Sequence, residues 1–171
     1  MDAEALLGPV PLAATHLVAG FDCGVVALND YLVRRALDDQ RAEKTRTFVA
    51  TRGGRVVAFF SLAAAAVEPA QATDRLAKGQ GSQNIPVILL ARFAVDGAEQ
   101  GRGLGEAMLV EAVARSAQAA DIIGARAIIV HAKDERARGF YEKYGFAASP
   151  TDPLHLIILM KDVRRSLQSR G

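Results

Sequence analysis

Hydrophobic positions near the N-terminal end of the chain follow first a helical and then a strand-like pattern. Residues 27–43 repeat their apolar side chains at helical spacing with polar residues between them, which predicts one amphipathic helix. The stretches 45–51 (TRTFVAT) and 55–67 (RVVAFFSLAAAAV) are rich in β-branched, aromatic and small apolar residues and flank the pair Gly53-Gly54. A glycine pair between two such runs predicts a β-hairpin.

The remainder of the chain alternates apolar runs with helical patterns. Residues 68–85 lose this periodicity and predict a loop with one helical turn around Asp74–Lys78, whereas a run that is apolar almost throughout predicts a buried strand at 85–96. Gly145 is placed to end a helix. Further helices are predicted at 104–120 and 134–146, and further strands at 125–132 and 154–161.

This order of elements predicts an α/β (α+β) fold with a mixed central sheet. A length of 171 residues is that of one compact domain. No internal repeat or linker interrupts the pattern, so we expect a single domain over 1–171 with a core at about 20–162. The residues 163–171 are expected to form a flexible tail.

Composition narrows the class of protein. Half of the residues are hydrophobic and 23% are charged, which is typical of a soluble globular protein. The N-terminus is acidic and lacks the layout of a secretory signal, and no apolar run is long enough for a membrane span. We therefore expect a cytoplasmic protein with no membrane contact.

The cysteine and histidines show no spacing typical of a metal site. Cys23 is the single cysteine, and we interpret it as a small apolar residue that is not a nucleophile. His131 stands within the predicted strand 125–132 and is expected to be a hydrogen-bonded core residue. His16 and His155 have no metal-like spacing, so no metal is expected.

Glycines are concentrated at 100–105 (QGRGLG), between a predicted strand and a predicted helix. Backbone N–H groups converge at such a helix start and can bind an anion such as a pyrophosphate if no Cβ blocks it. The Lys-Ser or Lys-Thr of a P-loop is missing, and the glycine spacing differs from the dinucleotide fingerprint. A plain tight turn remains the alternative on this stretch alone.

The pattern Gln-x-x-Gly-x-Gly at 100–105, with LLARFAVD before it and AIIVHA and FYEKYGF after it, resembles the GNAT (Gcn5-related) N-acetyltransferases. The resemblance covers about residues 20–162. It implies the GNAT fold, in which a mixed central sheet has helices on both faces and a splayed pair of parallel strands at the acetyl-CoA site. Acetyl-CoA is then the expected co-substrate.

The order of further segments resembles the TacT/AtaT-type toxins of bacterial toxin–antitoxin systems. These segments are FDCGVVALNDYL, RTFVA, FFSLAAAAV, IPVILLARFAVD, IGARAIIVHAKDERARGFYEKYGF and SPTDPLHLIILMKD. Members of this group acetylate the amino group of aminoacyl-tRNA and stop translation. The resemblance also implies a homodimer and a ribbon-helix-helix antitoxin as partner.

The GNAT resemblance assigns roles to residues at matching positions. The strand before the loop binds the pantetheine arm through main-chain groups, which here are those of Phe93, Ala94 and Val95. Tyr141 corresponds to the tyrosine that gives a proton to the leaving thiolate; the alternative is a core aromatic residue. The backbone amides of the loop hold the pyrophosphate, and the residues are Gln100, Gly101, Arg102, Gly103, Leu104 and Gly105.

No carboxylate stands out as a general base. Glu68, Asp96 and Asp134 lie at predicted strand or loop ends, where charged residues are common. The amine of an aminoacyl ester is less basic than a lysine, so water can take its proton. We therefore expect direct attack of this amine on the thioester, without an acyl-enzyme, and polarisation of the carbonyl by backbone N–H groups.

A basic cluster is the candidate contact for RNA. The net charge is only +2, so its distribution matters more than its sum. The predicted phosphate contacts are Arg34, Arg35, Lys44 and Arg46, and Arg92 is placed to reach the acceptor end. A solvated helix face is the simpler interpretation of the first four residues. An ordinary GNAT enzyme acting on a small-molecule or protein amine and a non-catalytic acyl-CoA-binding module remain the alternative functions.

Overall fold

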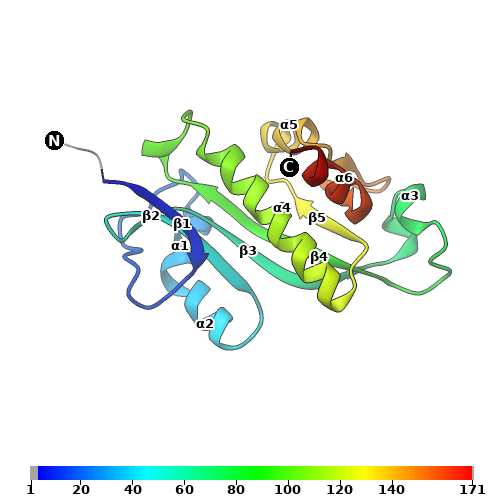
Figure 1. Cartoon of the computed structure of the whole chain (residues 1–171), viewed down its shortest axis with the longest axis horizontal. Helices are drawn as coiled ribbons and strands as arrows, with labels where there is room; N and C mark the ends of the chain where they lie inside the picture. Colours follow the sequence, from blue (N-terminus) through cyan, green and yellow to red (C-terminus); the bar gives the residue numbers. More distant parts are fainter. Residues whose placement is uncertain (1–3, 171) are drawn as a thin grey trace. The chain divides into compact units, whose positions relative to one another are not determined.

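The computed structural model of the chain describes residues 4–170, and Figure 1 shows their course. The helices and strands, in chain order, are β1 (Leu6–Pro11), α1 (Val26–Arg34), α2 (Ala36–Arg41), β2 (Arg46–Arg52), β3 (Arg55–Val67), η1 (Pro69–Gln71), α3 (Asp74–Ala77), β4 (Ile85–Val95), η2 (Gly97–Glu99), α4 (Leu104–Ile123), β5 (Ala127–His131), α5 (Glu135–Lys143), β6 (Ala147–Ala148), β7 (His155–Leu159) and α6 (Met160–Arg170). The strand order is β1-β2-β3-β4-β5-β7-β6. The mixed α/β architecture predicted from the sequence is therefore confirmed.

Two compact units divide the described chain. The first comprises the residues up to Ala63 together with Ala91–Ala112, and the second comprises Ala64–Leu90 and the residues from Val113 onward. β3, β4 and α4 each contribute residues to both units. We describe each unit by itself, and the single domain expected from the sequence stays a prediction.

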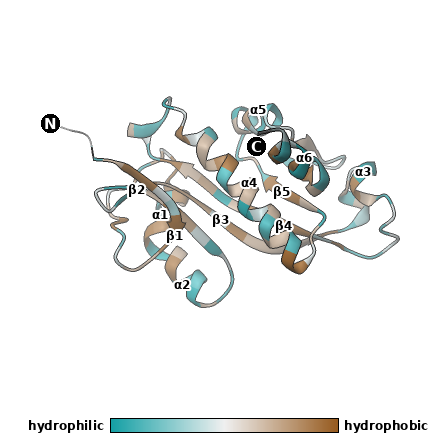
Figure 2. Cartoon of the chain, in the orientation of Figure 1, coloured by the Kyte–Doolittle hydropathy of each residue, from teal (hydrophilic) through white to brown (hydrophobic). Residues whose placement is uncertain are grey.

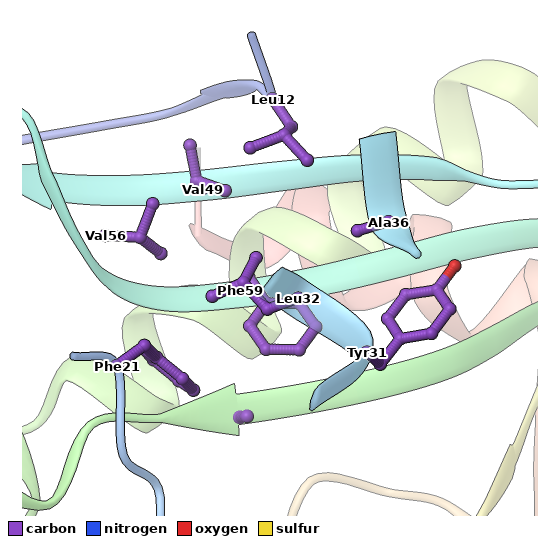
Figure 3. Packing of buried hydrophobic residues seen from close by; sticks show 9 residues of the cluster. Leu12, Phe21, Tyr31, Leu32, Ala36, Val49, Val56 and Phe59 are labelled. Atoms are coloured by element: carbon purple, nitrogen blue, oxygen red, sulfur yellow. The ribbon is translucent and has the colours of Figure 1, made fainter. Parts of the chain in front are cut away.

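The first unit is built on the predicted hairpin. β2 and β3 pair antiparallel, with Arg46 opposite Leu62 at one end of the ladder and Arg52 opposite Arg55 at the other. β1 adds to β2 antiparallel, which the sequence pattern did not predict. Buried side chains of this unit form a cluster that includes Leu12, Phe21, Tyr31, Leu32, Val49 and Phe59. Figure 3 shows these side chains packed together from α1, β2, β3 and the segment between β1 and α1.

The single helix predicted over 27–43 is wrong, because the structure divides it into α1 and α2 at Arg35. Arg35 has φ −130° and ψ −29°, outside helical values. The side chain of Gln40 draws α2 onto the strands, since its Nε2 donates to the carbonyl of Leu12 at 2.8 Å and its Oε1 accepts from the amide of Thr47 at 3.0 Å. These contacts join residues far apart in the sequence, so helical spacing alone does not reveal the break.

The second unit contains a parallel pair of strands. β4 and β5 pair in parallel, with Val87 opposite Ala127 and Leu90 opposite Val130. β7 pairs antiparallel with β5, and β6 pairs antiparallel with β7. A buried cluster lies on one face of these strands and includes Leu76, Ile85, Ile157 and Leu159. Figure 2 shows hydrophobic residues along β4 and β5 and hydrophilic residues on α5 and α6.

The irregular segment before β4 contains α3, as predicted, and Arg126 fastens it to the unit. The Arg126 Nε donates to the Leu76 carbonyl at 2.8 Å, and its Nη2 donates at 3.1 Å to each of the carbonyls of Arg75 and Lys78. These carbonyls lie at the end of α3, where a helix leaves acceptors without intrahelical partners. A guanidinium therefore completes the hydrogen bonding of this short helix.

The C-terminal end forms a strand and then a helix, and the flexibility expected of residues 163–171 stays a prediction. The last strand ends at Leu159 and not at residue 161, and the chain continues as α6. Val163 on this helix is fully buried. Arg75 binds Asp162 at 2.8 Å, and Arg164 binds Asp121 at 2.9 Å. Apolar packing and two ion pairs thus attach the helix.

No helix in the described part of the chain is long and apolar enough to cross a membrane.

Candidate functional site

The turn between β4 and α4 has the backbone conformation that its glycines allow. Gly101 and Gly103 adopt φ values of +81° and +84°, which side chains with a Cβ rarely adopt. A Cβ added at either residue would meet nothing within 4 Å, so the space above the backbone is open. Leu104 is buried and begins α4.

Several backbone donors of this turn are left for a ligand. Among residues 4–170, no hydrogen bond is formed by the amides of 101–106, whereas the amide of Gln100 donates weakly to Gly97 and that of Ala107 to Gly103. The first turn of a long helix and a run of free N–H groups together favour an anion. Arg102 is exposed beside them. These features fit the pyrophosphate of an acyl-CoA.

Gln100 has a role that its place in the motif did not predict. Its side-chain Nε2 donates to the Val95 carbonyl at 2.9 Å and to the Cys23 carbonyl at 3.4 Å. The same two segments are joined again nearby, because Asp96 Oδ2 accepts from the amide of Asp22 and the amide of Gly97 donates to the Asp22 carbonyl. Gln100 therefore positions the end of β4 and contributes no side-chain donor to the open face of the turn.

Glu99 anchors the same turn to β2. Its carboxylate accepts from Arg52 Nε at 3.2 and 3.1 Å and from Arg52 Nη2 at 3.1 Å, and the side chain of Glu99 is only 9% exposed. Such bidentate pairs fix orientation as well as distance. This anchor could not be read from the sequence, since Arg52 lies on β2, far from Glu99 along the chain.

The last residues of β4 are the candidate pantetheine strand. The parallel pairing of β4 with β5 ends where Leu90 lies opposite Val130. β4 itself continues beyond this point through Phe93 and Ala94 to Val95. Ala94 is buried in the cluster of the first unit. A Cβ added at Gly105 would lie 3.9 Å from Val95 Cγ2, so the end of β4 and the start of α4 are in van der Waals contact.

Tyr141 belongs to the second unit and lies on α5. Asp134 caps this helix by accepting from the amide of Ala137 at 2.8 Å, and Gly145, with φ +96°, follows its end, as predicted. The ring of Tyr141 is 6% exposed and packs on that of Phe146 at a centroid distance of 5.6 Å. Burial raises the pKa of the phenol, so this hydroxyl stays protonated.

His131 is not the core residue that the sequence suggested. It is exposed at the end of β5, and its ring stacks on that of His155 with a centroid distance of 3.9 Å. His155 Nε2 in turn lies 3.4 Å from Asp152 Oδ2. Desolvation and the neighbouring His155 lower the pKa of His131. The apolar run IIVHA predicted a strand correctly but gave no sign that its end is open to solvent.

The other candidate polar groups are engaged in local structure. Asp96 accepts from the amide of Ala98 at the start of η2, as Asp134 does on α5, and Glu68 is exposed. The Cys23 thiol donates to the Val25 carbonyl at 3.6 Å. Within residues 4–170, no group of three or more His, Cys, Asp or Glu is arranged to hold a metal ion.

The candidate RNA contacts all lie in the first unit. Arg34 ends α1, Arg35 joins α1 to α2, and Lys44 and Arg46 lie just before and at the start of β2; all four are exposed. In the described part of the chain none of the four forms an ion pair. Arg92 differs from them, because it is half-buried and stacks on an aromatic ring.

Comparisons with known proteins agree with this architecture. The sequence profile described as "Acetyltransferase (GNAT) domain" matches residues 43–148. The tRNA-acetylating toxin of Mycobacterium tuberculosis (strain ATCC 25618 / H37Rv) is 50% identical over 147 residues, which are 86% of this chain and 88% of that protein.

Solved structures share the fold of nearly all of the chain. AtaT complexed with acetyl-methionyl-tRNAfMet has a TM-score of 0.86 and 24% identity, covering 97% of this chain and 99% of that one. A mutant of the AtaT toxin bound to acetyl-CoA and to the C-terminus of the antitoxin AtaR has a TM-score of 0.80 and 23% identity, covering 98% of this chain and 99% of that one.

Proposed function

Because this chain belongs to the GNAT family of acetyltransferases, we propose that it transfers the acetyl group of acetyl-CoA to the amino group of aminoacyl-tRNA and so blocks translation. The observation that carries the choice of acceptor is the 50% identity, over 86% of this chain, to a tRNA-acetylating toxin. An identity of 50% supports a shared substrate as well as a shared fold. The protein is then a toxin of a toxin–antitoxin pair.

The β4–α4 turn holds the co-substrate in this proposal. The free amides after Gln100, from Gly101 through Arg102, Gly103 and Leu104 to Gly105, bind the pyrophosphate. Arg102 adds a charge-assisted contact. The main-chain groups of Phe93–Val95 bind the pantetheine arm, and Gln100 keeps the end of that strand in place.

The reaction needs no acyl-enzyme. The amino group of the charged tRNA attacks the acetyl carbonyl, so that a C–N bond forms, the C–S bond breaks and the amine proton passes to water. Tyr141, whose phenol burial keeps protonated, gives its proton to the departing sulfur and regains one from water, so that the free thiol leaves and the phenol is restored. Backbone N–H groups of the splayed strand polarise the carbonyl.

The exposed cations at the end of α1, between α1 and α2, and at the start of β2 bind the RNA. Arg34, Arg35, Lys44 and Arg46 contact phosphates, and such contacts give an affinity that falls with salt and depends little on base sequence. Arg92 serves the acceptor end. A homodimer, a ribbon-helix-helix antitoxin and a cytoplasmic location complete the proposal, and they rest on the resemblance to toxins of this type.

The test is transfer of radiolabelled acetyl to total aminoacyl-tRNA, with uncharged tRNA and a small polyamine as parallel acceptors. We expect label in nuclease-released aminoacyl-adenosine for the unaltered protein. Tyr141→Phe is expected to lower kcat by about a hundredfold or more, whereas the matched control Tyr144→Phe keeps it. Glutamate substitutions at Arg34, Arg35, Lys44 and Arg46 are expected to weaken transfer to tRNA alone.

Other outcomes decide for another function. Label that enters the polyamine or protein but no aminoacyl-tRNA identifies an ordinary GNAT enzyme. Binding of acetyl-CoA without transfer to any acceptor, with Tyr141→Phe indistinguishable from the unaltered protein, identifies a non-catalytic binding module.

A further inference from the structure

A cation–aromatic stack lies on the face of the first unit that carries α1 and α2. The guanidinium carbon of Arg92 is 3.8 Å from the centroid of the Tyr31 ring. Arg92 and Ala94 project from the same face of β4, because side chains alternate along a strand, and Ala94 belongs to the same buried cluster as Tyr31. The stack of Arg92 on Tyr31 is therefore in contact with the hydrophobic core of this unit.

The Tyr31 ring is held from several sides. The residue is 4% exposed, and its hydroxyl is 3.1 Å from Asp39 Oδ2 and 3.0 Å from Thr45 Oγ1. Figure 3 shows Tyr31 at one end of the packed cluster. Asp39 comes from α2 and Thr45 precedes β2, so two segments fix the far end of a ring that α1 supplies.

Stacking leaves the binding edge of the guanidinium unused. A guanidinium stacks through its flat face, whereas its N–H groups point outward in the plane and match a phosphate with two parallel bonds. Among the ion pairs of the described residues, none includes Arg92. It is half-buried, not enclosed. The cation is thus oriented and desolvated on one side before any ligand arrives.

We infer that Tyr31 is a positioning residue, which holds the guanidinium of Arg92 flat so that its N–H edge binds a phosphate of the tRNA acceptor end. This inference rests on the proposed function. Arg92 directly precedes Phe93, the first residue of the candidate pantetheine strand. A phosphate bound there brings the aminoacyl ester to the strand at which its amine reacts.

The test compares steady-state kinetics of Tyr31→Leu, Tyr31→Phe, Arg92→Gln and Arg92→Lys with aminoacyl-tRNA as the varied substrate. Tyr31→Leu removes the aromatic face and is expected to raise KM for aminoacyl-tRNA by about tenfold, with kcat and the KM for acetyl-CoA within about twofold. Tyr31→Phe keeps the face and is the matched control, with a KM near that of the unaltered protein. Arg92→Lys keeps the charge but loses the stacked edge, so its KM is expected to rise like that of Arg92→Gln.

Two further readouts separate positioning from a purely structural role. In the double variant Tyr31→Leu/Arg92→Gln, the loss is expected to equal that of Arg92→Gln alone, because the ring acts only through the cation. The slope of log KM against log salt is expected to fall by about 0.7 in Arg92→Gln, the loss of one phosphate contact, and to fall similarly in Tyr31→Leu.

Several results overturn the inference. One is an unchanged KM for aminoacyl-tRNA in Tyr31→Leu while Arg92→Gln raises it, and another is multiplied losses in the double variant. A rise in the KM for acetyl-CoA in Tyr31→Leu assigns the ring to the fold alone. If Tyr31→Leu does not fold, the result for Arg92→Lys decides the question. An unaltered KM for aminoacyl-tRNA in Arg92→Lys shows that the N–H edge of the guanidinium is not what binds the phosphate. Absence of transfer to aminoacyl-tRNA by the unaltered protein instead refutes the proposed function itself.

Discussion

The pair formed by Arg52 and Glu99 offers the sharpest test of how the β4–α4 turn is held. Glu99→Gln keeps the size of the side chain and removes the charge that accepts from Arg52 Nε and Nη2 at 3.1–3.2 Å. Removing one partner of a fully buried pair costs about 3–5 kcal/mol, whereas exposed pairs contribute about 0–1 kcal/mol. With side chains 23% and 9% exposed, we expect a loss of about 2 kcal/mol.

The assay is thermal unfolding together with acetyl-CoA kinetics. A loss of this size lowers the Tm of a chain of this length by about 4–8 °C. The KM for acetyl-CoA is expected to rise about threefold or more, because Glu99 directly precedes Gln100 and the free amides. Arg55→Gln is the matched control, since it breaks the pair of Arg55 with Glu4, 3.8 Å apart with side chains 60% and 58% exposed.

The control is expected to change Tm by less than about 2 °C. Equal Tm values for Glu99→Gln and Arg55→Gln would refute the argument from burial. A lowered Tm with an unchanged KM for acetyl-CoA would show that the anchor supports the fold and not the turn. The double variant Arg52→Gln/Glu99→Gln measures the coupling of the two residues directly.

Further predictions concern the β4–α4 turn, the clamp that Arg126 forms on the carbonyls at the end of α3, and the stacked pair of His131 and His155. Gly103→Ala is expected to raise the KM for acetyl-CoA by about tenfold, because φ +84° is strained with a Cβ; an unaltered KM would contradict the role of this backbone. Arg126→Gln is expected to cost about 1.5–3 kcal/mol in urea unfolding, since it leaves the carbonyls at the end of α3 without their charged donor; a change below 0.5 kcal/mol, on the order of a surface substitution, speaks against the clamp. The pKa of His131 is lowered by desolvation and by His155, so the unfolded chain binds more protons and stability falls as pH drops below about 6.5. Between pH 7.5 and pH 5, the Tm of a His131→Gln variant is expected to fall less than the Tm of the unaltered protein. Equal profiles of Tm against pH for the two proteins would contradict this.

Local patterns in the sequence predicted those elements whose signal is itself local. The glycine pair at 53 and 54 with alternating apolar residues around it predicted the β2–β3 hairpin, and Gly145 marked the end of α5. The glycines of the β4–α4 turn predicted a strand–turn–helix passage. In each instance one backbone conformation or one periodicity carries the information.

Features that depend on contacts between distant residues were missed. β1 contains Gly8, Pro9 and Pro11 and exposes Leu7, so it becomes a strand only because β2 pairs with it. The break at Arg35 depends on bonds that Gln40 forms elsewhere. α6 is an exception, because Met160, Val163 and Leu167 stand at helical spacing and this local signal was not used. The ring beneath Arg92 lies on a helix far from it in the sequence, and no spacing rule joins the two.

The main-chain donors of the β4–α4 turn have a consequence for the mutations that selection can find there. Replacing a side chain at 102 or 104 by any residue other than proline leaves every N–H group of the turn in the chain, so these substitutions change charge or packing but do not remove a donor. Apart from proline, only a change of backbone conformation can disperse these donors, and Gly101 and Gly103, with their positive φ values, are the residues at which one substitution has that effect. In a screen for survivors of a growth-arresting protein, inactivating changes in this turn would therefore gather at the two glycines, while Arg102 would tolerate many replacements.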